Sequence, residues 1–193
     1  MRWMWIDRVI ELVPGIKLVA IKNVSMAEEH LHDHFAAEPP GAHGLPDGPP
    51  DGRSASQAAL PVMPASLIVE GCAQTAGMLM GQTEGFKYNV ILAKVNKFTL
   101  ERDAVPGCTL RYSAVLERID ALGASVIIEI AMMDHGAPLT GFVPVGSMAV
   151  MLSHLDNNMG SAGIAGEDFP AHNFVFGPSF KTLLASSGVQ AGL

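Results

Sequence analysis

One stretch constrains the fold of this chain more than any other. Residues 61–81 consist mainly of small and apolar side chains and contain a single charge, Glu70, which is also the only charged residue between positions 54 and 83. Apolar residues on nearly every side of a helix predict that other structure encloses it. Pro64 suits a first helical turn, so we expect a central helix from near Pro64 to about residue 81.

Segments typical of strands lie on both sides of this helix in the sequence. Residues 16–25 are rich in β-branched side chains, and residues 26–35 suggest a second extended segment after a kink. Residues 3–13 have mixed periodicity and predict a short helical turn or bridge. Four further strands are expected and should form an antiparallel meander; they span residues 88–100, 108–120, 124–134 and 139–154.

An enclosed helix followed by a long antiparallel sheet buries its surface only if the sheet wraps around it. The predicted fold class is therefore α+β, with a hot-dog architecture in which a sheet wraps a long central helix. We expect one such domain over residues 1–154. Residues 155–193 are predicted to form a C-terminal extension that packs on the domain or stays partly flexible, with a short helix near residues 179–187.

Residues 36–60 interrupt the domain with closely spaced prolines and glycines, which exclude a regular helix or strand. A segment of this length is either a functional lid or a disordered surface insertion, and the insertion is the favoured interpretation.

Composition narrows the function classes. The formal net charge of -7 argues against nucleic acid as the main partner, and the 49% of hydrophobic residues favours a homo-oligomer. The chain shows no signal-peptide pattern and no apolar run of roughly 18 residues, so no membrane span is predicted and the cytoplasm is the expected compartment. Cys72 and Cys108 give no disulfide framework and are interpreted as small core residues.

The presence of Glu70 in an apolar helix needs an explanation, because burying an unpaired carboxylate costs about 3 kcal/mol or more. No cation occupies the neighbouring helical positions, which hold Ser66, Leu67, Ala73 and Gln74. A structural ion pair would therefore need a cation from a distant segment or another subunit. Removal from water also favours the protonated form of a carboxyl group, which prepares it to act as a general acid.

Three histidines form a second cluster, at His30, His32 and His34. On a strand, their alternation would place all three imidazoles on one face, where a metal site is conceivable. Solvent-facing histidines are the favoured interpretation for His30 and His32, whereas His34 is followed by Phe35 and then by the segment that leads into the helix. No metal and no cofactor are predicted.

Several short motifs in a fixed order resemble the 3-hydroxyacyl-ACP dehydratases of fatty-acid synthesis. The resemblance covers residues 3 to about 154 apart from the insertion. The motifs are Ile6-Asp7-Arg8-Val9-Ile10-Glu11-Leu12, Pro14-Gly15, Ala20-Ile21-Lys22-Asn23-Val24, His34-Phe35, Pro61-Val62-Met63-Pro64, Glu70-Gly71-Cys72-Ala73-Gln74, Phe98 and Val105-Pro106-Gly107.

This resemblance implies a hot-dog fold with an active site that forms across a homodimer, and it allows a trimer of such dimers as the larger assembly. It implies catalytic roles for His34, as the base at C2 of a 3-hydroxyacyl thioester, and for Glu70, as the acid that releases the C3 hydroxyl as water. The implied substrate-binding residues are Val62, Pro64, Ala65, Gln74 and Phe35, with no cofactor.

The chain departs from the family pattern around these positions. It has Asp33-His34-Phe35-Ala36 where Gly-His-Phe-Pro is usual, and Met63-Pro64-Ala65 where Met-Pro-Gly is usual. Two alternatives therefore stay open: a non-catalytic acyl-thioester-binding or assembly subunit, and a hot-dog thioesterase. The carrier, ACP or CoA, is also open, because Lys87, Lys94, Lys97 and Arg102 fit either an acidic carrier protein or a solvated strand face.

Overall fold

A computed structural model describes residues 4–32, 61–135, 141–155 and 175–188. The predicted insertion at residues 36–60 lies outside these ranges. The elements, in chain order, are β1 (Arg8–Val13), β2 (Lys17–Asn23), α1 (Glu29–His32), α2 (Ala65–Thr83), β3 (Val90–Leu100), β4 (Cys108–Asp120), β5 (Gly123–Asp134), β6 (Val143–His154) and α4 (Pro178–Ser186).

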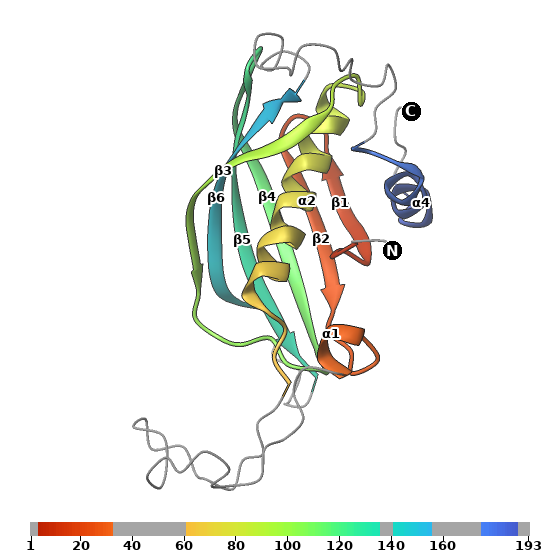
Figure 1. The fold of residues 1–193 in the computed structure, drawn as a ribbon, viewed down its shortest axis with the longest axis vertical. Coiled ribbons are helices and arrows are strands. Elements are labelled where there is room, and N and C mark those ends of the chain that lie inside the picture. Colours follow the sequence, from red (N-terminus) through yellow and green to blue (C-terminus); the bar gives the residue numbers. More distant parts are fainter. Residues whose placement is uncertain (1–3, 33–60, 136–140, 156–174, 189–193) are drawn as a thin grey trace, which may run out of the picture.

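The strands form one six-stranded antiparallel sheet in the order β1-β2-β4-β5-β6-β3. Figure 1 shows α2 lying lengthwise against one face of this sheet, which curves around the helix. The predicted α+β hot-dog architecture, with a long central helix wrapped by an antiparallel sheet, is confirmed.

The predicted meander is correct only in part. β4, β5 and β6 follow one another in the sheet, but β3 pairs with β6 and lies at the edge, so the chain crosses the sheet between β3 and β4. A sequence pattern marks each strand but does not specify which strand becomes its neighbour, and the prediction of β3 beside β4 was wrong for this reason.

Two local predictions at the N-terminal end were also wrong. The helical turn expected within residues 3–13 is largely strand β1, which pairs with β2 through a hairpin turn where Gly15 has φ +72°. The extended segment expected at residues 26–35 contains a helical turn, α1, so His30 and His32 do not alternate on a strand. A turn of helix places residues two apart on different faces.

The enclosed helix is confirmed. Every α2 residue from 71 to 81 is buried, and most of these side chains are small. Gly71 shows why small residues are needed, because a Cβ there would lie 2.8 Å from the ring of Tyr112 on β4. Backbone and aromatic ring therefore pack directly against each other, as glycine permits.

The C-terminal helix α4 agrees with the expected helix to within a residue at each end. Its Leu183 and Leu184 are buried in the core, and the Val9 N–H of β1 donates a hydrogen bond to Ser187 Oγ at 3.0 Å. Figure 1 shows α4 next to β1. None of the helices in the described part of the chain is both long enough and apolar enough to cross a membrane.

Candidate active site

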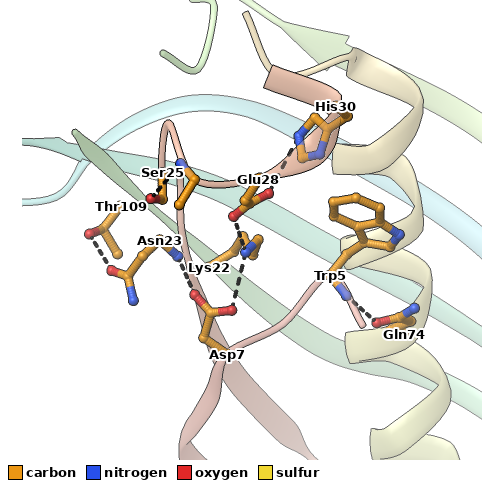
Figure 2. Close-up of polar contacts among 10 residues, drawn as sticks. Trp5, Asp7, Lys22, Asn23, Ser25, Glu28, His30, Gln74 and Thr109 are labelled. Atoms are coloured by element: carbon orange, nitrogen blue, oxygen red, sulfur yellow. Dashed lines mark hydrogen bonds and ion pairs between the residues drawn. The ribbon is translucent and has the colours of Figure 1, made fainter. Parts of the chain in front are cut away.

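Glu70 lies in the second turn of α2, where its side chain is partly exposed and lines a pocket. Its Oε1 accepts a hydrogen bond from Gln74 Nε2 at 3.0 Å, one helical turn further on. Gln74 Oε1 in turn accepts the backbone N–H of Trp5 at 2.9 Å, as Figure 2 shows. Because the Trp5 N–H can only donate, it fixes the orientation of the amide, which turns the Gln74 NH₂ group toward the carboxylate.

The start of α2 lies five residues before Glu70. The Met63 N–H donates to the Ala104 carbonyl at 2.8 Å and holds the entering chain, and the helix begins after Pro64. Ala65 and Ser66 are exposed, and no side chain among the described residues caps this end. The first N–H groups of a helix have no partner within it, so this end carries donors and partial positive charge.

The pocket beside Glu70 has a volume of about 330 Å³. Glu70, Ala73, Gln74 and Gly77 form one of its walls. These positions follow the i, i+3, i+4, i+7 spacing, so they share one face of α2. The other walls come from the start of β3, from Leu152 of β6 and from the segment that begins α4. The pocket is therefore polar at the Glu70–Gln74 end and apolar elsewhere.

The structure brings together only some of the predicted site residues. Glu70 and Gln74 contact each other, whereas Pro64 and Ala65 lie at the helix start with Val62 just before them, and these three do not line the pocket. His34 and Phe35 lie outside the described residues.

No sequence pattern indicates that Trp5, Phe176 or Phe180 lies at the site. Trp5 contributes a backbone N–H, which no side-chain pattern reveals, and Phe176 and Phe180 reach the pocket from about 100 residues further along the chain.

A polar network holds the last described residues before His34. Lys22 is only 6% exposed, and its Nζ contacts Asp7 Oδ1 at 3.2 Å and Glu28 Oε1 at 2.6 Å. His30 Nε2 lies 3.4 Å from the other oxygen of Glu28, and its ring packs edge-on against Trp5, with ring centroids 5.0 Å apart. Figure 2 shows how these contacts tie α1 to β2 and to the segment beside α2.

The described residues offer less support for a metal site or for a reactive cysteine. Within the described ranges, no group of three or more His, Cys, Asp or Glu side chains is arranged to hold a metal ion. Cys72 and Cys108 are both buried, and burial raises the pKa of each thiol. Thiolates are the reactive form, so the interpretation of both cysteines as core residues agrees with the structure.

The chain is similar to known proteins over the part that contains the central helix. Residues 58–136, which include Glu70 and Gln74, match the family model of the FabA-like domain. The 3-hydroxyacyl-[acyl-carrier-protein] dehydratase FabZ of Acidiphilium cryptum is 34% identical over 116 residues, covering 58% of this chain and 57% of that protein. FabZ of Listeria monocytogenes is 34% identical over 115 residues, covering 59% and 65%.

Residues 58–136 are thus similar to the FabA-like domain and lie within a hot-dog fold, and the resemblance of the chain to the 3-hydroxyacyl-ACP dehydratases is confirmed. It spans 57% to 65% of the length of these two relatives. A solved acyl-CoA hydrolase of Staphylococcus aureus, in complex with butyryl coenzyme A and coenzyme A, is 11% identical with a TM-score of 0.48, over 73% of this chain and 66% of that one.

Proposed function

We propose that this protein dehydrates a 3-hydroxyacyl thioester to the trans-2-enoyl thioester, in fatty-acid or related acyl metabolism. The observation that carries the proposal is the Glu70–Gln74 pair at the polar end of an apolar pocket, inside the segment that matches the FabA-like domain. The relatives named as 3-hydroxyacyl-ACP dehydratases support the same reaction.

Glu70 is the proposed general acid. In the reaction the C2–H and C3–O bonds break, a C2=C3 double bond forms, and water leaves with the C3 oxygen. Glu70 gives its proton to that oxygen, and Gln74, held by Trp5, orients the carboxyl group for the transfer. A positioned acid or base typically contributes about 10²–10⁴-fold to the rate.

The proposed base is His34, which would take the C2 proton. Its assignment rests on the dehydratase resemblance, in which a histidine from one protomer faces a glutamate of the other. We propose that the first N–H groups of α2, near Ala65, stabilise the negative charge that develops on the thioester carbonyl; the absence of a side-chain cap at this helix end supports that role. We propose that Val62, Pro64 and Phe35 complete the substrate contacts.

The carrier proposed for the substrate is ACP, because the relatives are named for acyl-carrier-protein substrates. Lys87, Lys94 and Lys97 are exposed and offer positive charge to an acidic carrier. Arg102 is exposed as well but lies 3.8 Å from Asp134. CoA thioesters are the alternative carrier.

The test is to supply 3-hydroxybutyryl and 3-hydroxydecanoyl thioesters of both ACP and CoA and to follow the ultraviolet absorbance of the enoyl product. The wild-type protein should form the enoyl thioester, and Glu70→Gln should lower kcat by about 100-fold or more with an unchanged Tm. Glu117→Gln, an exposed glutamate on β4, is the matched control and should keep full activity.

Two outcomes would contradict the proposal. Release of free thiol without enoyl product would indicate a thioesterase. Tight binding of the acyl thioesters without any turnover by the wild-type protein, on either carrier, would indicate a non-catalytic binding subunit.

A further inference from the structure

The pocket face of α2 runs from a polar end to an apolar end. Glu70 and Gln74 lie at one end, and Gly77 lies further along the same face. With a rise of 1.5 Å per residue, Gly77 is about 10 Å from Glu70 along the helix axis. A ligand with a polar reacting group and an apolar chain would therefore extend along α2 toward the C-terminal half of the helix.

Two glycines mark how far this space extends. A Cβ at Gly77 would have no atom of the described residues within 4 Å, so the space beside it is open. A Cβ at Gly81, one turn later, would lie 2.8 Å from the Phe176 ring and 2.9 Å from the Phe86 ring. The pocket is thus open at Gly77 and filled by aromatic rings at Gly81.

The rings at the closed end form a cluster. Phe176 packs edge-on against Phe86, with ring centroids 5.0 Å apart, and against Phe180, with centroids 5.6 Å apart. Phe176 and Phe180 both line the pocket, as does Val175. All three residues lie outside the segment that matches the FabA-like domain, so this wall is supplied by the chain's own C-terminal part.

The wall is anchored to the body of the protein. Leu183 and Leu184, on the same helix α4 as Phe180, are 7% and 1% exposed. The hydrogen bond from the Val9 N–H to Ser187 Oγ fastens the end of that helix to β1. Phe176 itself is 4% exposed. A pocket wall held by these contacts has a defined position and can therefore impose a length limit.

We propose that the segment 175–180 forms the end wall of an acyl-chain pocket, and that Phe180, with the open space at Gly77, sets the longest acyl chain the protein accepts. The identity of the ligand as an acyl thioester rests on the proposed function. The length limit itself rests on the pocket, on the contrast between Gly77 and Gly81, and on the aromatic cluster.

The test measures binding rather than turnover. S-alkyl pantetheine thioethers of increasing length, from butyl to hexadecyl, are titrated against the full chain by isothermal titration calorimetry. The affinity of the wild-type protein should rise by about fourfold for each methylene that enters the pocket, and should stop rising at one chain length. Phe180→Ala should move that limit to longer chains.

A second variant tests the same limit from the other direction. Gly77→Leu places a side chain in the open space and should move the limit to shorter chains, so the proposal stays testable even if Phe180→Ala unfolds. Lys181→Ala is the matched control, since it truncates an exposed side chain on the same helix that does not line the pocket. It should leave both Tm and the limit unchanged.

The outcomes separate this inference from the proposed function. Turnover of 3-hydroxyacyl thioesters with an unchanged limit in Phe180→Ala and Gly77→Leu would overturn the inference alone. Shifted limits in a protein without dehydratase activity would support the inference and overturn the function. A change of oligomeric state in Gly77→Leu, with no effect on chain length, would show that this face is a protein interface and would also overturn the inference.

Discussion

At the scale of single residues, the glycines of α2 have different surroundings and should respond differently to the same change. Gly77→Ala should raise the free energy of unfolding by about 0.5–1 kcal/mol, because a methyl group there meets no described atom and alanine favours the helix. Gly71→Ala should lower it by about 1–3 kcal/mol, since the new Cβ would lie 2.8 Å from the Tyr112 ring. Urea denaturation measures the free energy of unfolding of both variants. Equal changes in the two variants would contradict the prediction.

The buried thiol of Cys72 should make the stability of the protein depend on pH. Burial raises the pKa of this thiol well above its ordinary value of 9.0, so the folded protein keeps the proton while the unfolded chain loses it above that pH. The unfolded state then binds fewer protons, and stability falls as pH rises. One pH unit above the ordinary value, the loss should be about 1.4 kcal/mol.

Urea unfolding at near-neutral pH and at about pH 10 measures this loss, with Cys72→Ala as the comparison. The variant lacks the thiol, so its stability should decline less steeply with rising pH than that of the wild type. Its packing cost is the same at both pH values and does not affect this comparison. The Cys108 thiol, whose pKa burial also raises, contributes in the same direction in both proteins. If stability falls equally with pH in the wild type and in the variant, the pH dependence does not come from Cys72.

At the scale of elements, the central helix and most strands were predictable because local sequence carries their signals. β4 spans the predicted residues, and α2 lies within two residues of its expected bounds. β1 was not predictable from its own pattern, since its residues are mostly exposed and its strand geometry comes from pairing with β2. The place of β3 beside β6 depends on contacts about 50 or more residues apart in sequence.

Part of the candidate site was also predictable from local sequence, and part was not. Glu70 and Gln74 were recognisable because they are one helical turn apart in an otherwise apolar helix. The aromatic wall was not, because Phe176 approaches Gly81 from the far end of the chain and no local periodicity encodes that contact. Sequence patterns thus identified the polar end of the pocket, and only the fold identified its apolar end.

At the scale of the whole molecule, the edge of the sheet predicts how copies of the chain associate. Among the described strands, β3 pairs only with β6, and it exposes Ile91, Leu92 and Val95 by 36–39%. An apolar edge strand with unpaired backbone groups favours pairing with another strand. We propose that two copies pair through β3 to form the homodimer that the dehydratase resemblance implies.

Light scattering coupled to gel filtration tests this association. The wild-type protein should elute as a dimer or as a multiple of dimers, and Val95→Glu should shift the population to monomer by placing a charge in the pairing edge. Val115→Glu is the matched control, because Val115 is 44% exposed on β4, away from the edge, and should leave the assembly intact. A wild-type monomer, or a variant that still assembles, would overturn the proposed interface.

The hydrogen bond between Val9 and Ser187 joins positions 178 residues apart. During synthesis, β1 emerges from the ribosome long before α4 does. The sheet and the central helix can therefore assemble while the aromatic end of the pocket is still missing. Until α4 docks, the nascent domain exposes an apolar groove. A stall late in synthesis therefore leaves an aggregation-prone intermediate, which is the kind of species that chaperones bind.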